Sequence, residues 1–166
     1  MSNKIAFGCS HTYGIGVQPD EAWPALLGAV NCGKPGCSTD YITRICEEQI
    51  VEHKSTIAYF FWPDWTRFEH NHEQIMPNTH PHMYKDRTDK WLQDNREDKI
   101  VRIENICSKH DVLMVSMYME DLFGILDHCD RWPLGTDRRH FGPQWHKWLS
   151  DIFQVKQSFK EYEKTR

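Results

Sequence analysis

The chain has 166 residues, 39% of them hydrophobic and 27% charged, which is typical of one globular domain with a sizeable core. Its 20 basic and 24 acidic residues give a formal net charge of −4, which argues against nucleic-acid binding because no broad positive field is present. No apolar run is long enough to span a bilayer and no secretory leader is recognisable, so we expect a cytoplasmic protein with no membrane partner. The 6 cysteines are scattered without a CxxC pair, which favours reduced thiols over a zinc site.

The predicted elements begin with a short apolar run over residues 4–8, which indicates a buried, central strand that ends at a glycine. Residues 21–27 predict a short helix, and residues 28–31 a second, brief strand. A glycine-rich loop follows over residues 32–37.

Ser38 or Thr39 is suited to cap a helix that runs to about residue 53 and carries apolar residues at three- and four-residue spacing. The run Thr56-Ile-Ala-Tyr-Phe-Phe-Trp62 is nearly all apolar, as expected for a strand buried on both faces. Pro63 ends this strand.

Residues 63–88 show little periodicity and form a longer connection than compact domains usually contain, which predicts an irregular insertion. A charged helix over about 89–109, a buried strand over 112–117 and a final helix over about 142–160 complete the chain. This alternation predicts one α/β domain over residues 1–166, a three-layer α/β/α sandwich with a mostly parallel, flavodoxin-like sheet.

Active sites of such sheets lie beyond the carboxyl ends of the strands, where the turn Gly8-Cys9-Ser10-His11-Thr12-Tyr13-Gly14 follows the first strand. A serine hydroxyl is a weak nucleophile until a base takes its proton. Asp137 and His140 lie in a loop before the last helix, so the carboxylate can orient the imidazole and leave its other nitrogen free for Ser10.

These segments resemble the SGNH, or GDSL-like, hydrolase family. The resemblance rests on GCSHTYG near the start, NCGKPGCS over residues 31–38 and DRRHFGP over residues 137–143. It implies that Ser10 is the nucleophile and that Asp137 and His140 are the acid and base. It also implies that the amides of Ser10 and Gly36 bind the oxyanion, with Gly33 as the alternate glycine.

The third block of that family carries an oxyanion asparagine after the third strand, whereas this chain has Trp62-Pro-Asp64-Trp65-Thr66-Arg67. An ionised Asp64 offers no donor to an anion, but Thr66 or Arg67 could supply one. The substrate-pocket candidates are His11, Trp62, Asp64, Trp65, Thr66 and Arg67.

Other interpretations of these residues stay open. Cys9 could be the nucleophile of a thiol enzyme, although cysteine is more often buried. The histidines of the insertion could bind a metal, but no cysteine or carboxylate pattern accompanies them, and solvated loop histidines are the preferred interpretation; they are His70, His72, His80 and His82.

The sequence therefore predicts a serine esterase or deacetylase that cleaves a small acyl ester of a small molecule or carbohydrate through an acyl-enzyme, with no cofactor and no metal. The alternative is a catalytically silent binding or assembly module of the same fold, such as a viral accessory protein. The oligomeric state is left open.

Overall fold

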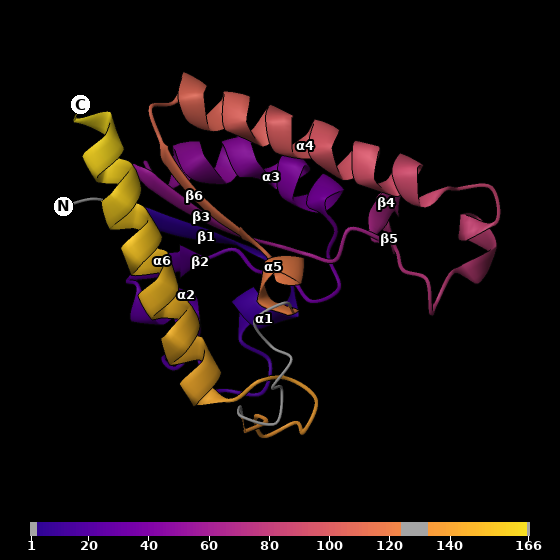
Figure 1. Ribbon diagram of the computed structural model, residues 1–166, viewed down its shortest axis with the longest axis horizontal. Coiled ribbons are helices and arrows are strands. Elements are labelled where there is room, and N and C mark those ends of the chain that lie inside the picture. Colours follow the sequence, from indigo (N-terminus) through magenta and orange to yellow (C-terminus); the bar gives the residue numbers. More distant parts are fainter. Residues whose placement is uncertain (1–2, 124–132, 166) are drawn as a thin grey trace.

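A four-stranded parallel sheet with the order β2-β1-β3-β6 forms the centre of the computed structural model, which describes residues 3–123 and 133–165 (Figure 1). The strands are β1 (Lys4–Gly8), β2 (Ala29–Asn31), β3 (Ile57–Trp62) and β6 (Leu113–Tyr118). Because β1 pairs with β2 on one side and β3 on the other, the chain changes direction across the sheet at β1. This is the flavodoxin-like order predicted from the sequence.

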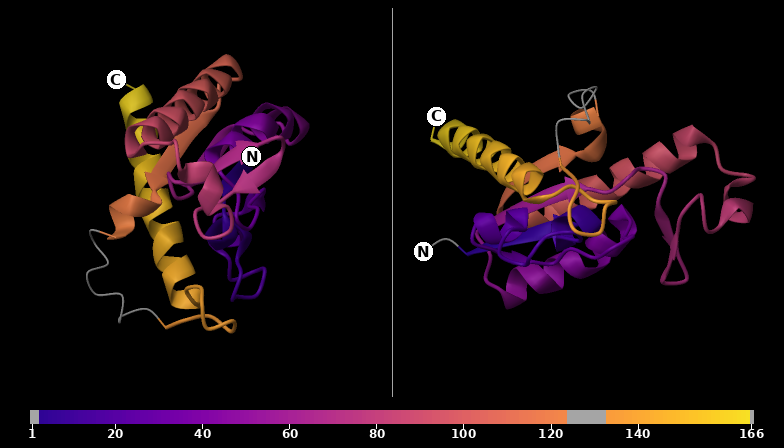
Figure 2. Two further views of the ribbon diagram at one scale, coloured as in Figure 1. Left: turned by 90° about the vertical axis from the view of Figure 1, so that its right-hand side faces the viewer. Right: turned by 90° about the horizontal axis from the view of Figure 1, so that it is seen from below.

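Helices cover both faces of the sheet and complete three layers. α3 (Thr39–Glu52) and α4 (Asp89–Lys109) pack on one face, while α2 (Trp23–Leu26) and the long α6 (Pro143–Lys164) pack on the other, as Figure 2 shows. The predicted fold class is confirmed. No helix in the described ranges is both long enough and apolar enough to cross a membrane.

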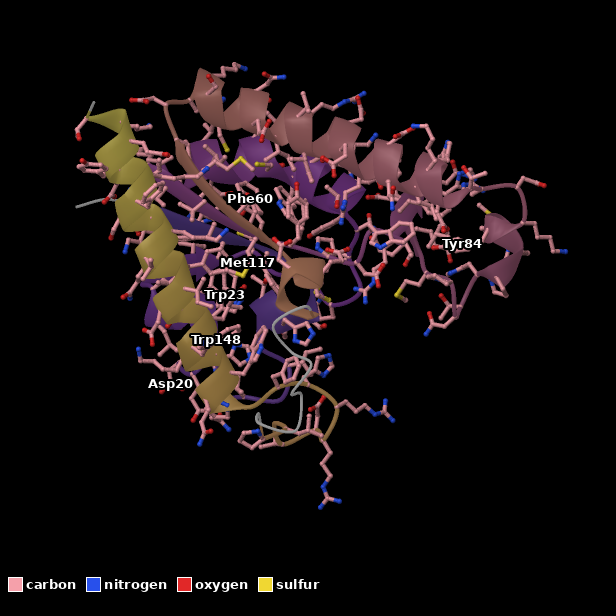
Figure 3. The ribbon with its side chains drawn as sticks, viewed as in Figure 1. Asp20, Trp23, Phe60, Tyr84, Met117 and Trp148 are labelled. Carbon is pink, nitrogen blue, oxygen red and sulfur yellow. The ribbon has the colours of Figure 1, made fainter. Side chains whose placement is uncertain are left out.

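The strict alternation of side chains along β3 explains why two cores form. Phe60 and Trp62 point toward α3 and α4, and Tyr59 and Phe61 point toward α2 and α6, so every residue of the strand is buried. Figure 3 shows Phe60 on the side of α4 and Trp23 on the side of α6.

The carboxyl ends of all four strands meet at one edge of the sheet, because the strands are parallel. The one-turn helix α1 (Ser10–Tyr13) follows β1 and α5 (Met119–Phe123) follows β6. The sequence predicted a turn where α1 lies and gave no signal for α5. Residues 32–37 and 63–67 supply the loops after β2 and β3.

The insertion contains a hairpin, β4 (Phe68–His70) and β5 (Glu73–Ile75), and a 3-10 helix, η1 (Pro81–Tyr84), where the sequence predicted irregular structure. It extends away from the sheet beside the start of α4 (Figure 1). A separate small cluster of Phe68, Ile75 and Leu92 supports it. The insertion therefore contacts the helices on one side of the sheet and borders the loop after β3.

Candidate active site

Ser10 is the first residue of α1 and lies immediately beyond the end of β1. Hydrogen bonds from Thr12 N (3.1 Å) and Tyr13 N (2.9 Å) to Cys9 O hold this tight turn. The turn buries the Cys9 side chain completely in the core and leaves Ser10 partly exposed. Of these two adjacent candidate nucleophiles, only Ser10 is accessible to a substrate.

The loop after β2 is fastened to the same turn. Lys34 N donates to Gly8 O (2.9 Å), and Cys37 Sγ donates to the same oxygen (3.2 Å). Gly33 lies so close to α1 that a Cβ there would be 2.4 Å from Tyr13 N, so a larger residue would displace the turn that carries Ser10.

The hydrogen bonds of this loop separate the two candidate oxyanion glycines. Gly33 N donates to Asn31 Oδ1 (2.9 Å) and is therefore occupied. Gly36, whose φ of 72° is left-handed, donates its N–H to no other group in the described part of the chain, and neither does the amide of Ser10. Ser10 and Gly36 thus keep two free amides beside the end of β1.

The loop between residues 133 and 142 brings Asp137 and His140 together. Asp137 Oδ1 accepts hydrogen bonds from Arg139 N (3.1 Å) and His140 N (3.0 Å), and its Oδ2 lies 2.6 Å from His140 Nδ1. These bonds, with the imidazole contributing most, lower the pKa of Asp137 to about 2. Because an ionised carboxylate only accepts, Nδ1 carries the imidazole proton, and Nε2 is left as the acceptor.

This loop is anchored beside α1. Thr136 N donates to Gly16 O (2.8 Å), and a Cβ at Gly16 would lie 2.9 Å from Asp137 Oδ1. The His140 ring contacts the ring of His11, with 5.3 Å between their centroids. His140 therefore lies next to the residue that follows Ser10, although the structure has no hydrogen bond between the described side chains of Ser10 and His140.

His11 contacts several aromatic rings and is partly exposed. The centroid of its ring lies 5.3 Å from those of both His140 and Trp145, and Phe61 and Phe141 are also in contact. Burial, followed by the charges of His140 and His146, lowers the pKa of His11 to about 4, so its imidazole is neutral near pH 7. Its Nδ1 is buried and unpartnered.

The remaining pocket candidates lie in or near the loop after β3, and one prediction among them needs correction. Trp62 is completely buried and stacks on Phe60 at 4.9 Å, so it is a core residue and does not line a pocket. Trp65 packs against the small cluster of the insertion. Asp64 Oδ1 accepts from both the amide (2.8 Å) and the hydroxyl (2.6 Å) of Thr66, which leaves neither Thr66 donor free. Arg67 has a buried Nη1 without a partner.

Sequence reasoning missed His146, which the structure brings close to this cluster. It lies on the buried face of α6, and its Nδ1 accepts a hydrogen bond from Trp23 N (3.2 Å). Burial, followed by the charge of His140, lowers its pKa to about 4. The sequence could have indicated this burial. His146 follows Trp145 and lies three and four residues before Leu149 and Ser150, so helical spacing places it on the same buried face of the helix.

The insertion histidines form no metal centre in the described ranges, where no cluster of at least three potential ligand residues is found. His80 instead contacts Glu73 (3.1 Å). A separate cleft of about 500 Å³ lies between α3, α4 and the hairpin, away from Ser10, and is lined by charged and polar residues: Asp40, Thr43, Arg44, Glu69, Asn71, His72, Lys99 and Arg102.

No protein-family model and no curated protein matches the sequence. Solved structures do match its fold over nearly the whole chain. Esterase EstA from Pseudoalteromonas sp., in a structure inhibited by monoethylphosphonate, has a TM-score of 0.51 and 12% identity over 98% of this chain and 100% of EstA. Axe2-W215I, an acetyl xylan esterase from Geobacillus stearothermophilus, has a TM-score of 0.51 and 13% identity over 95% of both chains.

A protein assigned to the lipolytic proteins of the G-D-S-L family, from Desulfitobacterium hafniense DCB-2, has a TM-score of 0.50 and 12% identity over 95% of this chain and 99% of its own. At such low identity these similarities establish the fold, and the resemblance seen in the sequence is confirmed at that level.

Proposed function

From the premise that this chain has the α/β fold of G-D-S-L-type esterases, we propose that it is a serine acyl hydrolase whose site consists of Ser10, His140 and Asp137. The observation that carries the proposal is the 2.6 Å contact between Asp137 Oδ2 and His140 Nδ1, in a loop that places the His140 ring against His11, next to Ser10. The same contact prepares Nε2 to accept a proton.

The reaction follows from these positions. Ser10 Oγ attacks the acyl carbonyl carbon while His140 Nε2 takes the hydroxyl proton, and the carbonyl electron pair moves onto oxygen. When this intermediate collapses, the bond to the leaving alcohol breaks and His140 returns the proton to it. Water then attacks the acyl-enzyme with His140 again acting as the base, which releases the acid and restores Ser10. We expect the Ser10–His140 hydrogen bond to form with the substrate bound, since such bonds tighten in the Michaelis complex.

The oxyanion is assigned to the amides of Ser10 and Gly36. Both donors are free of other acceptors in the described residues, whereas the amide of Gly33 is used by Asn31. Fixed donors of this kind act where charge develops, and the loss of one typically lowers kcat by about 10²- to 10³-fold.

The proposed substrate is a small acyl ester of a small molecule or carbohydrate. The likeness to an acetyl xylan esterase supports an acetylated sugar as the first compound class to screen. No step of the reaction requires a metal or cofactor.

The proposal is tested by intact-mass spectrometry after incubation with a fluorophosphonate, followed by peptide mapping. We expect one adduct on Ser10 in the wild type and none in Ser10→Ala, which should also lose hydrolysis of 4-nitrophenyl acetate. Cys9→Ala is the matched control, and it should keep labelling and turnover because Cys9 is buried in the core.

A folded wild-type protein that takes no adduct would contradict the esterase and favour the silent binding module. The charged cleft beside α3 and α4 would then be the first surface to test for a partner. Loss of labelling in Cys9→Ala, with Ser10→Ala still labelled, would instead indicate a thiol enzyme.

A further inference from the structure

Arg67 is a partly buried arginine at the edge of the site, and no hydrogen bond or ion pair to another described side chain holds its guanidinium. Its Nη1 is buried without a hydrogen-bond acceptor, and no described carboxylate forms an ion pair with it. Arg96 and Arg87 also have a buried Nε without an acceptor, but other contacts hold their guanidinium groups: Arg96 pairs with Glu120 at 2.9 Å, and Arg87 stacks on Phe68 and donates to Met83 O. A buried cationic N–H without an acceptor is costly, so its presence points to an acceptor that arrives with a ligand.

The charge of Arg67 acts on both sides of the proposed oxyanion site. It helps to lower the pKa of His11, after burial and the two neighbouring histidines. It also opposes the rise in the pKa of Cys37, which burial takes to about 12. Strand β3 pairs beside β1 with Phe61 opposite Gly8, so the loop that carries Arg67 and the turn that carries Ser10 begin at the same edge of the sheet. His11 follows Ser10 and Cys37 follows Gly36, so the charge of Arg67 acts on the neighbours of both residues that carry the free amides.

The other side chains of this loop cannot supply the same contact. The amide and hydroxyl of Thr66 both donate to Asp64 Oδ1, and that carboxylate, when ionised, is only an acceptor. Arg67 is therefore the side chain of the loop after β3 with a buried donor still available.

We propose that Arg67 is a catalytic residue that donates a charge-assisted hydrogen bond to the oxyanion, beside the amides of Ser10 and Gly36. The assignment rests on the proposed function. No bond to Arg67 forms or breaks and its guanidinium keeps all its protons. It stabilises the electron pair that moves onto the carbonyl oxygen and releases it when the intermediate collapses. Because the negative charge exists only near the transition state, Arg67 acts on kcat more than on KM.

The test compares Arg67→Met and Arg67→Lys with the wild type on 4-nitrophenyl acetate, a neutral ester. We expect Arg67→Met to lower kcat by about 10²- to 10³-fold with KM nearly unchanged, and Arg67→Lys to keep an intermediate kcat because it retains the charge. An alkyl boronic acid, which forms a tetrahedral anion on serine, should lose affinity for Arg67→Met. Added guanidinium ion should partly restore kcat in Arg67→Ala.

Arg102→Met is the matched control, since it removes the same charge from an exposed position on α4 that pairs with Asp98 at 3.1 Å. It should keep wild-type kcat. Circular dichroism and thermal melting show whether each variant folds. If Arg67→Met does not fold, the proposal is tested with Arg67→Lys alone.

Two outcomes overturn the assignment while the proposed function stands. The first is wild-type labelling at Ser10 together with an unchanged kcat in Arg67→Met. The second is a rise in KM alone when Arg67→Met acts on an ester that bears a carboxylate, such as mono-4-nitrophenyl succinate. Arg67 would then bind the charge of the substrate and not the oxyanion. If the wild type is not labelled at all, the proposed function fails and the Arg67 assignment falls with it.

Discussion

Replacing Asp137 with asparagine changes one atom of the proposed site and reverses the proton arrangement of His140. In the wild type, Asp137 Oδ1 accepts two backbone N–H groups while Oδ2 faces His140 Nδ1. The two backbone donors require an oxygen, so the asparagine side chain of the variant must keep its Oδ1 in that position. Its NH₂ group then faces His140 Nδ1.

The size of the effect follows from this orientation. An NH₂ donor forces Nδ1 to accept, which moves the imidazole proton to Nε2, and a protonated Nε2 cannot take the proton of Ser10. Turning the amide to restore the useful tautomer would sacrifice both backbone hydrogen bonds. Selecting the wrong tautomer in a Ser-His-Asp site costs about 10⁴-fold in kcat, so we expect a fall of about 10³- to 10⁴-fold.

The assay is steady-state hydrolysis of 4-nitrophenyl acetate at pH 8, with thermal melting to verify the fold. KM should change little, because Asp137 does not contact the substrate. Asp151→Asn is the control, since it makes the same replacement at an exposed α6 residue that pairs with Lys147. If Asp137→Asn keeps more than about a tenth of wild-type kcat, the role of Asp137 in orienting His140 is refuted.

Two further predictions concern the supports of the site. Gly16→Ala should lower kcat, because its Cβ would meet Asp137 Oδ1 at 2.9 Å; Gly28→Ala is the control, as it has a similarly positive φ but no neighbour within 4 Å. Both should lose about 1–2 kcal/mol of stability in urea unfolding, and equal turnover in the two variants would contradict the contact. The second prediction concerns His146, whose pKa in the folded protein is about 4, below its ordinary value of 6.5. As the pH falls, the unfolded chain therefore takes up a proton at this residue before the folded protein does. The stability that neutral His146 contributes above pH 6.5 is lost as the pH falls toward 4. That loss is roughly 2–3 kcal/mol, and urea unfolding of His146→Asn should depend less on pH over this interval than the wild type; an equally steep dependence would refute it.

The sequence by itself determined the layers of the fold and the order of the main elements. Periodicity and apolar runs are local properties of the chain, so β1, β3, β6 and the helices α3, α4 and α6 were predicted close to their observed bounds. The family-like segments also named Ser10, Asp137 and His140 as candidates, because their residue types and spacing carry chemical meaning without coordinates.

Only the tertiary structure decided which donors and side chains are available at the site. The sequence named Gly36 as the oxyanion glycine with Gly33 as the alternate, and the structure separates them because Asn31 occupies the amide of Gly33 and leaves that of Gly36 free. Trp62 is a possible pocket residue until the alternation of a strand buried on both faces places it in the core. The burial of His146 and the rings around His11 depend on contacts between distant segments, and no local pattern records such contacts, because packing and burial arise only when the layers assemble.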